Sequence, residues 1–208
     1  MSKAEKTRYF IIEKTAPIFN RKGFSGTSIT DLTEATGLTK GSIYGNFTDK
    51  DEVAIEALKY NLNLIINAVK QEKDNCTNSV ELLMAYTKAH RKFHDEIQQR
   101  GGCPLLNTLT EADDTHGELS RIASTMIKQW KREMVMIANN GKKLNEIKPE
   151  TDTAVLAETI ITLIEGGSFL TKSTGEKSYM KNAIDTAERL INEITLNSAE
   201  PGLSKKNN

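Results

Sequence analysis

The chain of 208 residues lacks the features that define several large classes of protein. Its formal net charge is zero, with 28 basic and 28 acidic side chains, so overall charge does not indicate a nucleic-acid partner. The start, Met1 to Lys6, has no apolar signal-peptide core, and no apolar run approaches the ~18 residues of a membrane helix. Its two cysteines, Cys76 and Cys103, lie too far apart in sequence to suggest a disulfide framework. We therefore expect a soluble, cytoplasmic protein with no membrane partner.

The sequence also lacks the patterns of strands and of common enzymes. No stretch sustains the alternation of apolar and polar residues that marks a half-buried strand. A glycine-rich phosphate loop, a nucleophile elbow and a metalloprotease motif are all missing. Apolar residues make up 38% of the chain, which is ordinary for a soluble protein with a buried core. We predict an all-α protein that is not an enzyme and needs no cofactor.

The segment from residue 27 to residue 47, TSITDLTEATGLTKGSIYGNF, predicts two short helices joined by a tight turn. Ser28 can cap the first helix, and Thr39 can cap a second helix that runs from Lys40 to about Phe47. Gly37 supplies the backbone freedom that a sharp corner between helices requires. Such pairs also occur as plain packing units in all-helical proteins. The polar, small-residue face of the second helix favours a helix that enters the DNA major groove.

The predicted DNA contacts combine small residues, which allow close approach, with hydroxyl, amide and ammonium donors for phosphates and base edges. Two of them precede or open neighbouring helices, where backbone N–H groups favour phosphate. The predicted DNA-binding residues are Thr27, Thr39, Lys40, Gly41, Ser42, Tyr44, Gly45, Asn46 and Lys50.

The first quarter of the chain resembles the TetR family of bacterial transcription regulators, of the AcrR-like type. The positions that carry the resemblance are Ile11, Ile12, Ala16, Ile18, Phe19, Lys22, Gly23, Phe24, Thr27, Ser28, Thr39, Lys40, Gly41, Ser42, Ile43, Tyr44, Asn46, Phe47, Asp49 and Lys50. The resemblance implies a homodimeric regulator, in most cases a repressor, that leaves a palindromic double-stranded operator when a small-molecule effector binds. A helical ligand-binding protein or enzyme without DNA affinity is the competing interpretation.

Six further amphipathic segments predict about nine helices in total. We expect a DNA-binding domain over residues 1–50, a ligand-binding and dimerisation domain over 51–197, and a disordered tail over 198–208. The six predicted helices that follow the helix-turn-helix segment span approximately residues 49–71, 78–99, 104–112, 117–140, 152–170 and 177–196.

The last two predicted helices are candidates for the dimer interface. The penultimate helix is apolar over more than half its circumference, whereas one monomer's core needs only a stripe. Paired with the last helix, it could form a four-helix bundle across a two-fold axis, as the TetR resemblance also implies. A fully buried helix within one monomer is the alternative. The predicted interface residues are Leu156, Ile160, Leu163, Ile164, Gly167, Ile184 and Ile191.

Large, adaptable side chains in the middle helices could line an effector pocket rather than fill the core. His90 and His94 have metal-ligand spacing, but two ligands make no site, and a third from His116 or Asp113 would be needed. We therefore predict no metal. The predicted pocket residues are Phe93, His94, Leu105, Leu109, Met126, Trp130, Met134 and Phe169.

Cys103 lies in the sequence Arg100-Gly-Gly-Cys-Pro, at a helix start and close to an arginine. Both features can lower a thiol pKa, which makes Cys103 a candidate redox sensor. The alternative is a small buried side chain that opens a helix, and this is our prediction. Glu111, Asp113 and Asp114 could resemble a catalytic acid pair, but acidic residues before a helix are more simply explained as caps.

Overall fold

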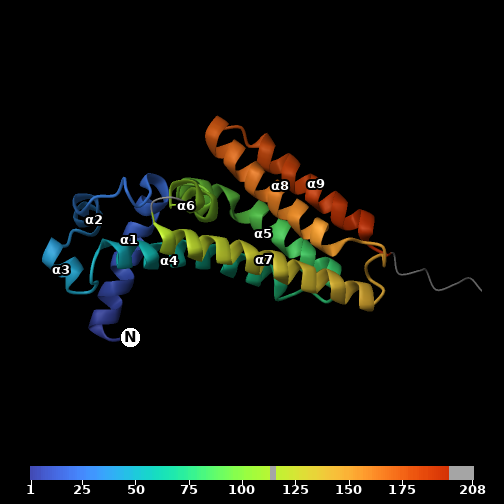
Figure 1. Cartoon of the computed structure of the whole chain (residues 1–208), viewed down its shortest axis with the longest axis horizontal. Coiled ribbons are helices and arrows are strands. Elements are labelled where there is room, and N and C mark those ends of the chain that lie inside the picture. The colour runs from blue at the N-terminus through green and yellow to red at the C-terminus, as the bar shows by residue number, and fades with distance from the viewer. Residues whose placement is uncertain (113–115, 197–208) are drawn as a thin grey trace, which may run out of the picture.

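The computed structural model describes residues 1–112 and 116–196, which form an elongated all-α molecule (Figure 1). The predicted fold class is confirmed, whereas the predicted tail and the pair Asp113 and Asp114 lie outside the described residues. The nine helices of the described part are α1 (Lys3–Lys22), α2 (Ile29–Thr36), α3 (Lys40–Tyr44), α4 (Lys50–Lys73), α5 (Ser79–Gln99), α6 (Pro104–Ala112), α7 (Gly117–Lys143), α8 (Thr153–Thr174) and α9 (Ser178–Ile194).

Helices α1 to α3 lie together at one end of the molecule (Figure 1). The Ser28 hydroxyl accepts the Asp31 N–H, and the Asp31 carboxylate accepts the Ser28 N–H, so the two close a capping box at α2. Gly37 ends α2 with a left-handed backbone (φ 68°), as the predicted corner requires. Helix α3 ends at Tyr44, three residues earlier than predicted, because the chain turns at Gly45 while Phe47 still packs in the core.

Helix α4 connects this module to the rest of the molecule, because it packs against both α1 and α5. Asn61, near its middle, is buried, and its Nδ2 donates to the Ala16 carbonyl oxygen of α1 at 2.9 Å. A buried side-chain amide with a backbone partner fixes the axial position of α4 relative to α1.

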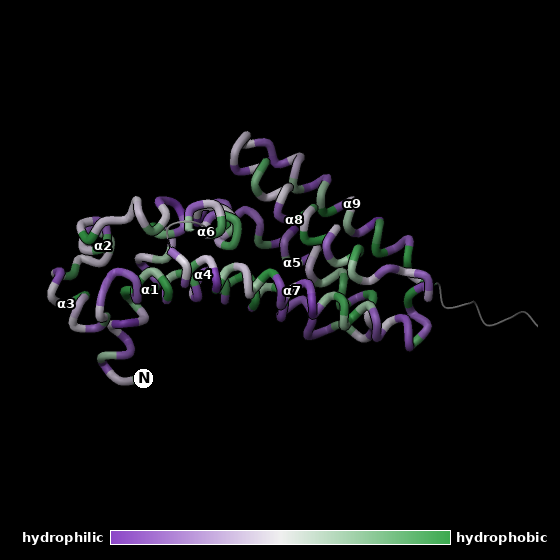
Figure 2. Tube along the Cα trace, in the orientation of Figure 1, coloured by the Kyte–Doolittle hydropathy of each residue, from purple (hydrophilic) through white to green (hydrophobic). Residues whose placement is uncertain are grey.

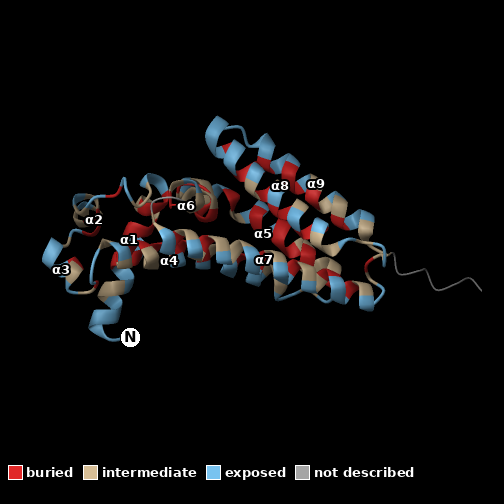
Figure 3. Cartoon of the chain, viewed as in Figure 1, coloured by how far each residue is buried: buried red, intermediate tan, exposed pale blue. Residues whose placement is uncertain are grey.

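The remaining helices bury the larger core. Figure 3 shows buried residues concentrated along α5 and the inner side of α8, whereas α3 is largely exposed. Helix α7 continues through Gly141 to Lys143, beyond its predicted end near residue 140. A Cβ at Gly141 would lie 2.7 Å from Ile147 Cδ1 and 2.8 Å from Ser79 Cβ, so glycine serves close packing here.

Helix α8 is the one helix of the described chain that is long and apolar enough to cross a membrane. It packs against α9 on one side and against α5 and α7 on another, and one third of its most apolar window is buried. Figure 2 shows hydrophobic residues recurring along both α8 and α9. Helix α8 is therefore a partly buried core helix.

Candidate nucleic-acid interface and effector cavity

Helix α3 presents its polar residues to solvent, and buried apolar residues on its opposite side anchor it to the core. Ile43 and Phe47 are buried, whereas Lys40, Gly41 and Ser42 are exposed. The Thr39 hydroxyl caps the helix by accepting the Ser42 N–H at 3.1 Å. A Cβ at Gly41 would meet no atom closer than 3.9 Å, so this face is open to a close partner. These positions agree with a helix that approaches a phosphate-lined groove.

Arg8 of α1 holds the end of α3 in place, a role that the sequence did not reveal. Its Nη1 donates to the Asn46 carbonyl oxygen at 2.6 Å, and its Nη2 donates to Glu52 Oε1 at 2.7 Å. The guanidinium also lies over the Phe47 ring, 4.1 Å from its centroid. Hydrogen bonds from Thr48 and Arg8 lower the pKa of the Glu52 carboxyl. The signal in the sequence was only an arginine one turn before the apolar Ile11.

Two of the predicted DNA contacts, Thr27 and Lys50, make hydrogen bonds to the loop between α1 and α2. Thr27 is buried, and its hydroxyl donates to the Gly23 carbonyl oxygen at 2.6 Å. The prediction of Thr27 as a surface DNA contact is therefore corrected. Its hydroxyl already donates to a carbonyl oxygen of its own loop and is not available to a phosphate. The Lys50 ammonium donates to the carbonyl oxygens of Phe24 and Thr27, at 2.9 and 3.1 Å. Lys50 thus fixes the loop between α1 and α2.

A cavity of about 380 Å³ lies between α4, α5, α7, α8 and the start of α6. This volume falls within the range of small-molecule sites. Three predicted residues line it, namely Leu105, Met126 and Trp130. The complete lining is Leu62, Ile65, Ile66, Val69, Lys70, Lys73, Tyr86, His90, Leu105, Met126, Gln129, Trp130, Glu133 and Glu165.

The other predicted pocket residues lie elsewhere. Phe93 lines a smaller cavity of about 260 Å³ beside Arg100, and Phe169 lines a third cavity next to α1. His94, Leu109 and Met134 line none of these three cavities; Met134 is fully buried as part of the core. Sequence periodicity identifies inward-facing side chains but not which of them border empty space.

An aromatic stack forms one wall of the 380 Å³ cavity. The Trp130 ring lies nearly parallel to His90, with an interplanar angle of 8° and a centroid distance of 5.4 Å, and it also stacks on Tyr86. His90 Nδ1 is 2.8 Å from the Tyr86 carbonyl oxygen. Burial lowers the pKa of His90 to about 4, so the ring is neutral near neutral pH. Within the described residues, no group of three or more His, Cys, Asp and Glu side chains could hold a metal.

Cys103 sits next to this cavity and is buried. Its Sγ donates to Glu165 Oε1 at 3.3 Å. Burial, followed by the nearby Glu165 carboxylate, raises the pKa of the Cys103 thiol well above its usual value. A thiol that resists ionisation is a poor redox or electrophile sensor, which favours the core role over the sensor role.

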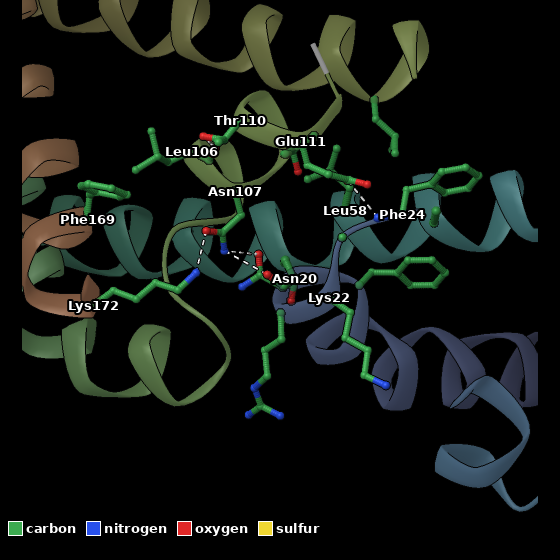
Figure 4. A pocket seen from close by; sticks show the side chains of 17 residues that line it. Asn20, Lys22, Phe24, Leu58, Leu106, Asn107, Thr110, Glu111, Phe169 and Lys172 are labelled. Atoms are coloured by element: carbon green, nitrogen blue, oxygen red, sulfur yellow. Dashed lines mark hydrogen bonds between the residues drawn. The ribbon is translucent and has the colours of Figure 1, made fainter. Parts of the chain in front are cut away.

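The third cavity, of about 460 Å³, lies where α1, α4 and α6 meet (Figure 4). Figure 4 shows Asn107 reaching toward Asn20 on one side and Lys172 on the other. The Glu111 carboxylate of α6 accepts the backbone N–H groups of Phe24 and Ser25, at 2.9 and 2.8 Å. Helix α6 therefore contacts both the end of α1 and the loop that leads to α2.

The predicted dimer residues require a correction. Six of the seven are buried in the single chain, where they pack α8 against α9, α5 and α7, and Leu163 is half-buried. Side chains that are already buried cannot form the surface that meets a second copy. A stripe of α8 that shares only Leu163 with the predicted set remains at least partly accessible. Its members are Val155, Thr159, Thr162, Leu163, Gly166 and Leu170.

A helix-turn-helix module with an exposed second helix, joined to a helical domain, defines a DNA-binding regulator. The family described as "Bacterial regulatory proteins, tetR family" matches residues 11–57, and "Tetracyclin repressor-like, C-terminal domain" matches residues 79–187. The chain belongs to the TetR family, whose members are transcription regulators and not enzymes.

Similar proteins span nearly the whole chain. A TetR-family regulator of Cytophaga hutchinsonii is 42% identical, with a TM-score of 0.87 over 95% of this chain and 98% of that one. The HTH-type transcriptional regulator YxaF of Bacillus subtilis (strain 168) is 24% identical over 86% of this chain and 91% of its own. The HTH-type transcriptional repressor ComR of Escherichia coli (strain K12) is 23% identical over 88% of each chain.

Proposed function

We propose that this TetR-family regulator is a cytoplasmic homodimeric repressor that a small molecule releases from a palindromic operator. Residues 1–50 would form the DNA-binding domain, and residues 51–197 the ligand-binding and dimerisation domain. The similarity to ComR, which is named as a repressor, supports repression over activation. The exposed polar face of α3 supports direct contact with double-stranded DNA.

The course of α4 is the observation that carries the proposal. At one end Lys50 holds the loop before α2, and farther along Asn61 is bonded to α1. The following turns, from Leu62 to Lys73, line the 380 Å³ cavity. A ligand that shifts these turns would therefore move the DNA module. A coupling of about 1–3 kcal/mol would already make a usable switch.

The dimer is needed because two recognition helices must reach successive major grooves, ~34–36 Å apart. The accessible stripe of α8, from Val155 to Leu170, supports an interface between two copies. Val155 is 55% exposed and Leu170 is 40% exposed in the single chain, which is unusual for apolar side chains on a core helix.

Fluorescence anisotropy with the promoter DNA next to the protein's own gene tests the proposal. We expect Tyr44→Ala and Lys40→Ala each to weaken binding by roughly 1–3 kcal/mol, with a thermal midpoint close to that of the wild type. Lys88→Ala, an exposed lysine on α5 far from α3 in sequence, is the control for loss of one charge. Unchanged affinity of both α3 variants would contradict the assignment of this helix.

A further inference from the structure

Glu165 of α8 is a half-buried acid that lines the 380 Å³ cavity, and the contacts of the fold do not fully explain it. Its Oε1 accepts the Cys103 thiol, whereas its Oε2 is buried and has no hydrogen-bond partner among the described residues. A carboxylate kept from water without a cation or several donors is strongly disfavoured. Burial accordingly raises the pKa of Glu165. A cationic donor beside Oε2 would supply the missing partner and favour the charged form of the carboxyl.

We propose that the cavity binds an amphipathic organic cation, a protonated amine on an apolar body, whose N–H donates to the Glu165 carboxylate. The inference rests on the proposed function, because it names the chemical class of the effector for that same cavity. A charge-assisted hydrogen bond is about twice as strong as a neutral one.

The remaining walls suit the apolar part of such a ligand. Successive turns of α4 contribute aliphatic side chains to the cavity wall. Helix α6 contributes Leu105, and helix α7 contributes Met126. The flat Trp130 ring supplies an aromatic surface, which attracts both apolar groups and cations. The Trp130 Nε1 is also buried without a partner in the described chain, so it can donate to an acceptor on the ligand. The aliphatic side chains of α4 that line the cavity are Leu62, Ile65, Ile66 and Val69.

An organic anion is the main alternative, because Lys70 and Lys73 also border the cavity. The Lys73 ammonium, however, donates to Glu133 Oε1 and to the Tyr86 hydroxyl, both at 2.7 Å. Lys70 is exposed, where water already solvates its charge. The buried group without a counter-ion is therefore acidic, and this asymmetry favours a cation.

Trp130 is the single tryptophan of the chain, so its fluorescence reports directly on the cavity. The probes are phenylbutylamine, phenylbutanol and phenylbutyrate, which share one apolar body and differ in the charge of the head group. We expect the full-length protein to bind the amine about tenfold or more tighter than the alcohol, and the acid more weakly than either. Equal binding of amine and alcohol, or preferred binding of the acid, would overturn the proposal.

Glu165→Gln keeps the shape of the side chain and removes its charge. In this variant the affinities for the amine and the alcohol should be about equal. The affinity for the alcohol should stay within about twofold of its wild-type value. Glu158→Gln, on the same helix but paired with Lys131 at the surface, should keep the preference. A preference that survives in Glu165→Gln would refute the role of this carboxyl. The comparison of probes on the wild type remains decisive if the variant folds poorly.

DNA binding is measured separately, by anisotropy with and without the amine. Binding of the amine without release of DNA would contradict the effector role in the proposed function and leave the ligand class supported. If the unliganded protein does not bind DNA, this result would contradict the proposed repressor function but not the proposed ligand class.

Discussion

Asn107, in the first turns of α6, donates its side-chain N–H to both the backbone and the side-chain oxygen of Asn20 in α1, at 3.0 and 3.1 Å. It also donates to the Gly101 carbonyl oxygen at 2.8 Å. In return, Asn20 Nδ2 donates to the carbonyl oxygens of Arg100 and Gly102, both at 2.9 Å. Two amides thus join the end of the DNA module to the turn between α5 and α6.

We expect Asn107→Ala to lower the free energy of unfolding by about 1–3 kcal/mol, because it leaves partly buried oxygens without a donor. If this joint also transmits the effector signal, the variant will need more ligand for release of DNA. Urea unfolding and anisotropy measure the two effects. Asn182→Ala, on the exposed surface of α9, is the control and should change neither. Wild-type stability of Asn107→Ala would contradict the structural role of the joint.

Arg8→Ala should weaken DNA binding even though Arg8 makes its contacts inside the DNA module. The substitution removes the bonds to the Asn46 carbonyl and to Glu52, so the end of α3 loses its fixed position. Arg8→Lys should recover little, because one ammonium cannot reproduce the fork of donors and the stacking on Phe47. Anisotropy and thermal unfolding give the readout; full activity of Arg8→Lys would show that charge alone suffices.

Stability should fall as the pH is lowered from about 6.5 to about 4, in part through His90. The unfolded chain takes up a proton at the usual pKa of about 6.5, whereas the buried ring in the folded state resists protonation until about 4. The unfolded state therefore binds more protons in this window, which lowers the stability of the fold by up to about 3 kcal/mol. His90→Gln does not titrate, so its urea midpoint should fall less over the same window. Parallel pH profiles of the two proteins would contradict the assignment.

Two adjacent glycines of α8 have different surroundings, so their variants test the proposed dimer and the fold separately. A Cβ at Gly166 meets nothing within 4 Å, whereas a Cβ at Gly167 lies 2.8 Å from Ala183 Cβ and 3.2 Å from the Met180 backbone. Gly166→Glu should therefore give a folded monomer, because the charge would be buried only in the dimer. Gly167→Ala should instead lower the thermal midpoint by separating α8 from α9. Sedimentation and thermal unfolding distinguish them, and a dimeric Gly166→Glu would exclude this stripe as the interface.

Helix positions and the DNA module could be predicted because their signals are local. Caps such as Ser28 and Thr39, and a corner such as Gly37, act within four residues of sequence. Most of the predicted interface residues are buried within the single chain, and the sequence could not show this for the opposite reason. Helix α8 is apolar on two sides, and hydropathy alone does not tell the side that is buried, at Ile160, from the side that faces solvent, at Val155.

The sequence predicts only part of the lining of the 380 Å³ cavity, for a similar reason. Trp130 and Leu105 were recognised as large, inward-facing residues, but Glu165 was missed because a lone acid in an apolar helix carries no distinctive spacing. The joint between the two parts of the molecule was also missed. Asn20 and Asn107 are 87 residues apart, and only the folded chain brings their amides together.

The burial of Cys103 has a practical consequence for spectroscopy. Its thiol is buried and Cys76 is only partly accessible, and burial raises the pKa of both above the usual value. Both native thiols should therefore alkylate slowly near neutral pH. A cysteine introduced at Ser42, on the exposed face of α3, would accept a dye first without removal of either native cysteine. Energy transfer between two such dyes would then measure the separation of the recognition helices in a dimer, and its change when an effector is added.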